Sequence, residues 1–471
     1  MRKYAKCEKA TGKLSKLVTE MKMRENHYLW VHAGRDIRMR IERPRYLESL
    51  IDKRENGLVK VITGMRRCGK SYLLFHLYRE YLQSTDVEDS RIIELALDEI
   101  RYARYRNPLE LDRCIRDKIT DNEMHYVFLD EIQKVTSIQN PYVDDTNATI
   151  GFVDVLLGLM KMKNVDVYVT GSNSRMLSSD ILTEFKDRGD EIRVNPLSFL
   201  EFYQAYEGER RNAWRDYYTY GGMPVVMQKK TNEAKSKYLK DLVTKTYIAD
   251  VVERNKILTD TDVLEDILNM VSSSIGSLTN PTKLANTLES VKKRKIAAAT
   301  INKYLGYFED AFIISKAYRF DIKGKRYFDS PLKYYYTDVG LRNARLNFRQ
   351  QEENHIMENI LFNELISRGF DVAVGEVEHN YKNEEGYSRR SRLEVDFVAN
   401  KPPKRYYIQS TLSIADEEKR RQKTNSLYRI GDSFKKIVVV KDNILPWYDE
   451  KGVLFMGIEQ FLLDEMAMDL V

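Results

Sequence analysis

Cysteine and histidine are scarce in this sequence, and neither is spaced as a structural framework would be. The 471 residues include three cysteines, Cys7, Cys68 and Cys114, and six histidines. An odd number of cysteines without paired spacing excludes a disulfide scaffold and is typical of a reducing compartment, so we expect a cytoplasmic protein. The cysteines and histidines do not recur at zinc-ligand spacing, which argues against a zinc module.

Long hydrophobic runs are absent as well. A membrane helix needs about 20 consecutive apolar residues, whereas "GFVDVLLGLMKMK" is shorter and contains Asp154 and Lys161. The basic N-terminal segment lacks the central apolar block of a secretion signal. We therefore expect neither a membrane span nor export.

A strong charge of one sign is also missing. Lysine and arginine exceed aspartate and glutamate by 77 − 71 = 6, a small excess that identifies no partner by itself. Hydrophobic residues make up 42% and charged residues 31%, which favours folded cores over disorder. Because the chain is too long for one ordinary core, we expect two to four domains.

A glycine-rich basic segment interrupts an apolar run early in the chain. The sequence "GMRRCGKS", residues 64–71, fits G-x-x-x-x-G-K-[ST], the pattern of a phosphate-binding loop. The preceding "LVKVIT" predicts a buried strand, and the following "SYLLFHLYREYL" has helical apolar spacing. Strand, loop and helix therefore occur in the order that the motif requires.

The chemistry of this loop predicts ATP and Mg²⁺ as cofactors. Its glycines let backbone N–H groups converge on phosphate oxygens, Lys70 reaches the outer phosphates, and the Ser71 hydroxyl is a Mg²⁺ ligand. The residues predicted to bind the nucleotide are Gly64, Arg67, Cys68, Gly69, Lys70, Ser71 and Tyr72.

A second apolar segment, "HYVFLDEIQKV", ends in two acidic residues. On a neighbouring strand, Asp130 would hold the Mg²⁺ together with Ser71, and Glu131 would act as the general base toward the water that attacks the γ-phosphate. The alternative is that both residues merely begin a solvated loop.

Two further catalytic candidates follow a third predicted strand, "VDVYVT". Asn173, just beyond that strand, would orient the attacking water, although Gly, Ser and Asn are also ordinary turn residues. Arg188 precedes a short strand and would neutralise charge in the transition state, in cis or from a neighbouring subunit. Arg175 is a rival for the same role.

Five segments together resemble a known family. "GMRRCGKS", "VFLDEIQ", "VTGSNSRML", "PLSFLEFY" and "YGGMPVV" are similar to the prokaryotic AAA-type ATPases that carry a C-terminal nuclease-like domain. The similarity runs from about Met39 to the C-terminus, because the family usually opens with a segment like "MRIERPRYLESLI". Residues 1–38 depart from that pattern, and we expect a partly disordered extension or a start codon placed too early.

The middle of the chain predicts helices and then a hairpin. A charge-rich helical stretch after "YGGMP" indicates a lid over the nucleotide edge, or simply a solvated face. Three helices and two strands joined at Lys323-Gly324-Lys325 suggest a winged helix. Its third helix, predicted to begin with Thr300 as its cap, and basic residues at 292–295 and at the wing would contact DNA; packing or protein docking is the alternative.

The C-terminal part resembles the restriction-endonuclease-like fold. In active members an acidic residue on the second strand and E-x-K or Q-x-K on the third surround a divalent metal. Here Asp396 and Gln409 occupy these positions and Glu358 lies on the preceding helix, but the lysine is missing unless Lys419 or another lysine replaces it. We therefore expect a degenerate site in which Glu358, Glu394, Asp396 and Gln409 are remnants.

The predicted fold class is α/β, with a P-loop NTPase parallel sheet and helices followed by a winged-helix domain and a restriction-endonuclease-like α/β domain. The expected ranges are 1–38 for the extension, 39–225 for the ATPase domain, 226–345 for the helical segment and winged helix, and 346–471 for the nuclease-like domain.

Three functions remain open at this point. The first is an ATPase that acts as a nucleotide-driven switch on a nucleic acid or a protein. The second is a DNA-processing nuclease licensed by ATP, and the third is a scaffold that binds ATP without hydrolysing it. The oligomeric state is also open between a ring and a monomer or small assembly.

Overall fold

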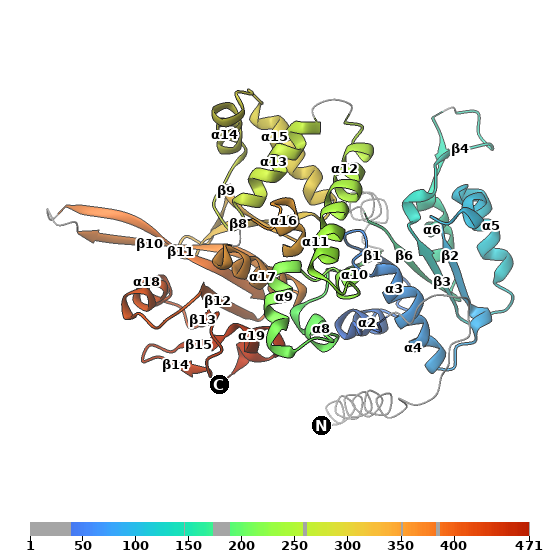
Figure 1. Ribbon diagram of the computed structural model, residues 1–471. Helices are drawn as coiled ribbons and strands as arrows, with labels where there is room; N and C mark the ends of the chain where they lie inside the picture. The colour runs from blue at the N-terminus through green and yellow to red at the C-terminus, as the bar shows by residue number, and fades with distance from the viewer. Residues whose placement is uncertain are drawn as a thin grey trace. The chain divides into compact units, whose positions relative to one another are not determined.

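Two large β-sheets organise the described part of the chain, one before and one after a group of helices (Figure 1), and β4 Ile138–Gln139 pairs with β5 Thr149–Ile150 in a small two-stranded sheet. The computed structural model describes residues 39–145, 147–172, 189–257, 261–349, 352–382 and 387–470. Residues 41–471 form one compact unit. The expected extension, 1–38, lies outside the described residues.

The first sheet is parallel throughout and has the strand order β2-β3-β6-β1-β7. β1, β3 and β6 are buried almost throughout, as expected for a sheet covered on both faces, whereas the edge strand β7 is polar and mostly half-buried. In a parallel sheet all carboxyl ends meet at one edge, so the segments that follow β1, β3 and β6 share that edge. The bounds are β1 Val59–Thr63, β2 Ile92–Ala96, β3 His125–Asp130, β6 Val165–Thr170 and β7 Gly189–Arg193.

Helices cover both faces of this sheet because successive strand residues alternate between the faces. Phe128 and Tyr168 pack with Leu74 and Tyr78 on one face, whereas Val127 packs with the helices on the other. On the first face, α3 Lys70–Tyr72 continues through a π-helical stretch, Leu73–Tyr78, into α4 Arg79–Ser84. The neighbouring helices are α2 Pro44–Asp52, α5 Pro108–Lys118 and α6 Phe152–Met160.

Mainly helices connect the two sheets. α8 Phe199–Gln204, α9 Ala213–Tyr220 and α10 Pro224–Met227 come first. A second composite helix follows, consisting of α11 Asn232–Asp241, a π-helical stretch Leu242–Ile248 and α12 Ala249–Arg254. The next three are α13 Thr261–Ser273, α14 Pro281–Lys292 and α15 Ala298–Asp310.

The predicted start of α15 is wrong. The helix begins at Ala298, with Ala297 in the cap position, so Thr300 lies inside the first turn and is not its cap. Alanine has the highest intrinsic helix propensity, and the alanines before Thr300 extend the helix upstream.

The second sheet is mixed and has the order β14-β15-β13-β12-β11-β10-β8-β9. The hairpin β8–β9 belongs to it because β8 pairs in parallel with β10. Its strands are β8 Ile314–Asp321, β9 Arg326–Tyr336, β10 Asp371–Lys382, β11 Ser388–Lys401, β12 Lys404–Thr411, β13 Lys435–Val440, β14 Trp447–Tyr448 and β15 Val453–Gly457. Its helices are α16 Val339–Arg345, α17 Glu353–Ser367, α18 Glu417–Tyr428 and α19 Ile458–Leu463.

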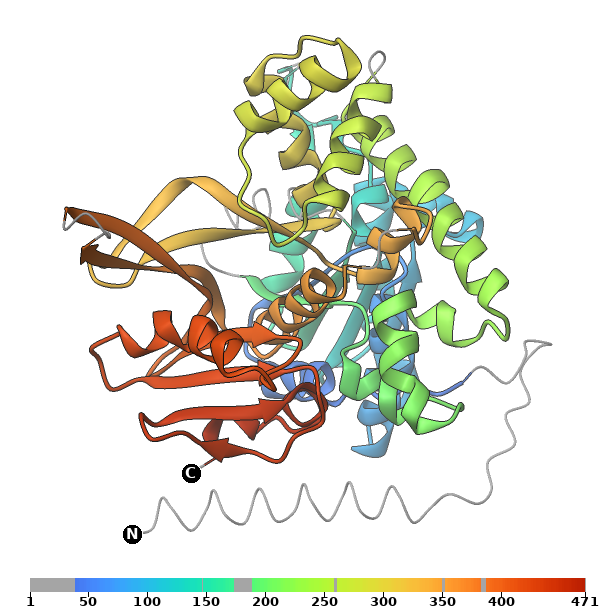
Figure 2. The ribbon, with the colours of Figure 1, turned by 60° about the vertical axis from the view of Figure 1, so that its left-hand side comes forward.

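β10 and β11 continue beyond their neighbours as a two-stranded ribbon (Figure 2). β12 pairs with β11 only from Phe397 onward, and β8 pairs with β10 only at 374–376. In the part of the chain that the structure describes, no helix is long and apolar enough to cross a membrane.

Candidate nucleotide site

The loop between β1 and α3 has a backbone that depends on its glycines. Gly64 and Gly69 have φ values of 137° and 105°, a region that L side chains rarely adopt. A Cβ atom at Gly64 would also lie 2.1 Å from the Val194 carbonyl oxygen. Arg67, at φ 65°, adopts the left-handed conformation without being glycine. The loop is therefore fixed in a conformation that few other sequences could adopt.

Lys70 is buried within this loop, with 4% of its surface exposed. Its ammonium group donates to the carbonyl oxygens of Gly64 and Met65, at 3.0 and 3.1 Å. No carboxylate pairs with Lys70 among the described residues. A buried cation held only by carbonyls keeps its positive charge uncompensated. This arrangement fits a site for phosphate.

The acidic pair at the end of β3 is held by a residue that the sequence did not single out. The Thr170 hydroxyl, at the end of β6, donates to Asp130 Oδ1 and accepts from the Glu131 backbone N–H at 3.1 Å. Glu131 has a φ of 52°, the left-handed region. Because β6 lies between β1 and β3, Thr170 joins the acidic pair to the edge that carries the phosphate-type loop.

The Glu131 carboxylate has two polar neighbours. The side-chain amide of Gln133 donates to Glu131 Oε2, and the Ser172 hydroxyl lies 3.5 Å from the same oxygen. Ser172 is buried. These two contacts give the Glu131 carboxylate a defined orientation at this edge of the sheet.

The other residues predicted to bind nucleotide or to act in catalysis range from exposed to buried, and some lie outside the described residues. Ser71 is exposed at the start of α3, and Tyr72 is half-buried. Cys68 is buried and donates to the Val194 carbonyl at 3.3 Å. Asn173 and Arg188, like the rival Arg175, lie outside the described residues.

Arg43 holds the backbone of the loop through a hydrogen bond, a role that sequence reasoning missed. Its buried guanidinium donates to Glu201 Oε1 at 2.8 Å, to the Cys68 carbonyl at 3.0 Å and to the Asn195 carbonyl at 2.8 Å. Burial opposes the charge, but Glu201, Tyr46 and Cys68 together outweigh it, so the pKa of Arg43 lies above its ordinary value. A lone arginine before a helix carries no local signal of such a role.

A second polar cluster lies in the C-terminal sheet, around residues predicted to be remnants of a nuclease site. Buried Lys333, on β9, donates to Glu358 Oε1 at 2.9 Å and to Glu394 Oε1 at 2.6 Å. Sequence reasoning found no lysine here because Lys333 comes from a strand outside the expected motif. Burial opposes the charge of Lys333, but the two carboxylates outweigh it and raise its pKa.

The residues of this cluster do not fit a divalent metal. Glu358 Oε1 is used by Lys333 and by the Tyr335 hydroxyl, and Asp396 Oδ2 accepts from the backbone and the hydroxyl of Ser410. The Gln409 amide donates to the Glu394 carbonyl, while its side-chain oxygen has no partner among the described residues. Within those residues, no group of three or more His, Cys, Asp or Glu side chains could hold a metal ion.

The parallel sheet with a phosphate-type loop after β1 and an acidic pair after β3 defines a P-loop ATPase of the AAA type. Residues 56–203 match the family model described as "AAA domain", which confirms this class. Residues 211–352 match a second model, "Domain of unknown function (DUF8612)".

Two proteins of unassigned function are similar over most of this chain. An uncharacterized protein of Haemophilus influenzae is 31% identical over 405 residues, covering 85% of this chain and 93% of its own length. The uncharacterized protein MJ1544 of Methanocaldococcus jannaschii is 29% identical over 360 residues, covering 72% and 71%. The chain belongs to the same family as the Haemophilus protein.

Two solved structures resemble parts of the chain at low identity. The Walker-type ATPase PABY2304 of Pyrococcus abyssi has a TM-score of 0.47 and 15% identity, covering 66% of this chain and 99% of that one. The Aeropyrum pernix ORC1 protein, solved in complex with DNA, has a TM-score of 0.30 and 10% identity, covering 65% and 93%. The winged helix and the restriction-endonuclease-like domain stay predictions.

Proposed function

We propose that this protein binds ATP with Mg²⁺ at the loop 64–71, hydrolyses it, and uses the change in phosphate state to move its helical middle part. The observation that carries the proposal is the buried Lys70 ammonium without a carboxylate partner among the described residues, at the sheet edge that also bears Asp130 and Glu131.

The roles of the residues follow from their chemistry. Bound ATP·Mg²⁺ supplies a γ-phosphoryl group whose developing charge the metal neutralises. Lys70 and the backbone of the loop bind phosphate oxygens, and Ser71 and Asp130 hold the metal. Glu131 takes a proton from the attacking water. The further nucleotide contacts come from Gly64, Arg67, Cys68, Gly69 and Tyr72, with Asn173 and Arg188 as additional catalytic residues.

The proposed division of the chain is an ATPase domain at 39–225, a helical and winged-helix part at 226–345 and a nuclease-like domain at 346–471. The winged helix would comprise α13, α14, α15 and the hairpin β8–β9. The succession of α17, β10, β11, β12, α18 and β13 supports the restriction-endonuclease-like assignment.

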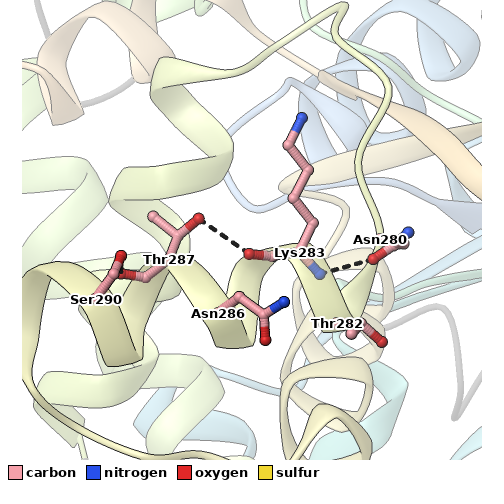
Figure 3. A pocket seen from close by; sticks show the side chains of 6 residues that line it. All are labelled: Asn280, Thr282, Lys283, Asn286, Thr287 and Ser290. Carbon is pink, nitrogen blue, oxygen red and sulfur yellow. Dashed lines mark hydrogen bonds between the residues drawn. The ribbon is translucent and has the colours of Figure 1, made fainter.

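Two helices are candidates for contact with a nucleic acid, α15 as predicted from the sequence and also α14. α15 buries five residues, including Ile301, Tyr304 and Phe308, and exposes Asn302 and Lys303 near its N-terminal end. α14 instead presents a polar face (Figure 3) formed by Asn280, Thr282, Lys283, Asn286, Thr287 and Ser290. In the basic run that follows, Lys292 and Arg294 form ion pairs with Asp266 and Asp262 of α13. This pairing reduces the charge available for phosphates, so nucleic acid and protein both remain candidate partners.

The alternative of an ATP-licensed nuclease has less support. A nuclease site needs a lysine, and Lys333 could supply one. Its ammonium group, however, forms ion pairs with Glu358 and Glu394, the carboxylates that a metal would need. We therefore propose that this cluster stabilises the fold and that the domain lacks nuclease activity.

Two substitutions test the ATPase. Lys70→Ala should weaken ATP binding about 10- to 100-fold, because it removes a charge-assisted contact worth about 1.5–3 kcal/mol. Glu131→Gln should bind ATP normally and lose turnover by about 100-fold or more, because the general base is removed. Equilibrium binding of a fluorescent ATP analogue and steady-state phosphate release measure the two effects.

The matched control is Lys161→Ala, since Lys161 is an exposed lysine just after α6. It should leave binding and turnover unchanged. Normal hydrolysis by both Lys70→Ala and Glu131→Gln would refute the ATPase. Binding without any turnover dependent on Glu131 would instead support the scaffold alternative.

A further inference from the structure

The end of the composite helix 232–254 contacts the phosphate-type loop directly. Arg66 Nη1 lies 2.6 and 2.8 Å from the two carboxylate oxygens of Asp250, on α12. One turn earlier, the buried Tyr247 hydroxyl donates to the Arg66 carbonyl at 2.7 Å. The helix therefore binds both the side chain and the backbone of one loop residue.

The same turn of α12 also reaches the end of β6. Arg254 donates to the Ser172 carbonyl from Nη1 at 3.1 Å and to the Ser172 hydroxyl from Nη2 at 2.8 Å. Two parallel contacts from a planar guanidinium fix the position of the residue that accepts them. Ser172 is in turn the residue whose hydroxyl lies 3.5 Å from Glu131 Oε2.

These contacts form one continuous network. Asp250 and Arg254 are one helical turn apart, and their charged groups lie 3.9 Å from each other. Arg66 and Ser172 follow β1 and β6, which are adjacent strands. One turn of α12 therefore spans the loop expected to hold the phosphates and the strand end that faces Glu131, so a shift of the helix would release both contacts together.

We infer that Arg254 is a positioning residue for hydrolysis. It holds Ser172, and through the Ser172 hydroxyl it orients the Glu131 carboxylate, only while α12 lies against the loop 64–71. Turnover is then conditional on the position of α12, which lies within the segment that matches the second family model. The inference rests on the proposed ATPase function and identifies the element that couples the middle part of the chain to it.

Variants of the network distinguish positioning from binding. Arg254→Ala should lower kcat about 10- to 100-fold, because a misplacement of about 1 Å in a catalytic group can cost that much. The affinity for ATP should stay within about twofold, since the hydrogen bonds and the ion pair that the structure describes for Arg254 go to Ser172 and Asp250 and not to the loop 64–71. Arg254→Lys should recover only part of the rate because one ammonium cannot make both contacts with Ser172. Glu253→Gln, an exposed neighbour on α12, is the matched control and should be normal.

A double-mutant cycle tests the route through Ser172. If Arg254 acts through the Ser172 hydroxyl, Ser172→Ala should lower kcat similarly, and the double variant should be no slower than Arg254→Ala. Independent, additive losses would overturn the route.

Hydrogen exchange gives a readout apart from turnover. In the wild-type protein, amides of 249–257 and 170–172 should exchange slowly and together, whereas in Arg254→Ala both segments should exchange faster while β1 and β3 remain protected. A variant that exchanges faster throughout has lost its fold, and Arg254→Lys then carries the test.

The outcomes separate this inference from the proposed function. If Lys70→Ala and Glu131→Gln impair the protein while Arg254→Ala turns over normally, the ATPase stands and the positioning role fails. If neither Lys70→Ala nor Glu131→Gln has an effect, the ATPase itself fails. Reduced kcat in Arg254→Ala with unchanged ATP affinity and local loosening of α12 supports the inference.

Discussion

Buried Glu358 shares the Lys333 ammonium group with Glu394, and the charge of Asp396 also acts on it. Burial raises the pKa of Glu358 to about 7, against the lowering effect of Lys333, and Asp396 adds to the rise. The folded protein therefore holds a proton on Glu358 over a range of pH in which the unfolded chain has released it. Such a difference makes the free energy of unfolding depend on pH.

The pH dependence has a definite sign. Because the folded pKa of about 7 lies above the ordinary value of 4.5, the stabilising contribution of protonated Glu358 is complete below about 4.5 and is lost as the pH rises through about 7. Glu358→Gln cannot ionise, so its free energy of unfolding should fall less steeply than that of the wild type across this window. Urea unfolding at a series of pH values, taken as the difference between the two proteins, measures the effect.

The same measurement tests the cluster for a metal. Millimolar Mg²⁺ or Mn²⁺ should leave both profiles unchanged, because the Lys333 ammonium group already pairs with Glu358 and Glu394. Stabilisation by the metal in the wild type but not in Glu358→Gln would contradict this and would revive the nuclease alternative. Parallel profiles without metal would show that Glu358 does not hold the extra proton.

At the scale of single residues, the positions of the motif residues could be predicted from the sequence, whereas the residues that hydrogen-bond to them could not. The positions of Lys70 at the start of α3 and Asp130 at the end of β3 could be predicted, because the phosphate-loop motif has a fixed spacing from its strand; their roles stay predictions. Thr170 and Arg43 act through hydrogen bonds to residues far away in the chain, and Lys333 reaches its carboxylates from another strand. Only the fold brings these partners together.

At the scale of elements, α16 is packed unusually closely against the end of α9. A Cβ atom on Gly340 would lie 2.0 Å from the Tyr220 carbonyl oxygen, and the Asn343 amide donates to the carbonyls of Tyr218 and Thr219 at 2.9 and 3.0 Å. Gly340 is thus required for backbone contact between two helices rather than for a turn.

Gly340→Ala should destabilise the protein by about 1–3 kcal/mol or more, because backbone atoms of α9 must move to admit the methyl group. Gly306→Ala is the matched control: Gly306 lies inside α15, and its added Cβ would have no atom within 4 Å. That substitution should stabilise by about 0.5–1 kcal/mol through helix propensity. Urea midpoints at an unchanged slope measure both, and destabilisation of equal size in the two variants would contradict the close approach.

The strands were largely predictable, whereas their assembly was not. The runs "VDVYVT" and "FKKIVVVKD" are rich in β-branched residues and correspond to β6 and β13. The pairing of β8 with β10, however, joins a hairpin to a strand that follows two intervening helices. Such non-local pairing depends on how faces are buried in three dimensions and leaves no periodic signal in the sequence.

At the scale of the whole molecule, polar contacts connect segments that pack around the first sheet with segments of the C-terminal part. Arg45, on α2, donates to Glu465 at 2.7 Å and lies 3.5 Å from Glu364 of α17. Asp338, the cap of α16, accepts from the Gly222 backbone N–H at 2.7 Å. These contacts join segments from both ends of the chain, so we expect the two sheets to unfold cooperatively.

Two tryptophans allow this expectation to be tested with ATP. Trp214, on α9, lies beside Phe199, and Trp447 stacks on Phe455 in the C-terminal sheet. ATP at 100 times its Kd should add about 2.7 kcal/mol to the free energy of unfolding. In single-tryptophan variants, with Trp30 and the other tryptophan replaced by Phe, both probes should report the same urea midpoint and the same shift with ATP·Mg²⁺. Lys70→Ala should reduce the shift at both positions to about 0.4–1.4 kcal/mol, because its 10- to 100-fold weaker binding leaves the same ATP concentration at only about 1 to 10 times its Kd. A shift at Trp214 with none at Trp447 would mean that the C-terminal sheet unfolds independently and that nucleotide energy does not reach it.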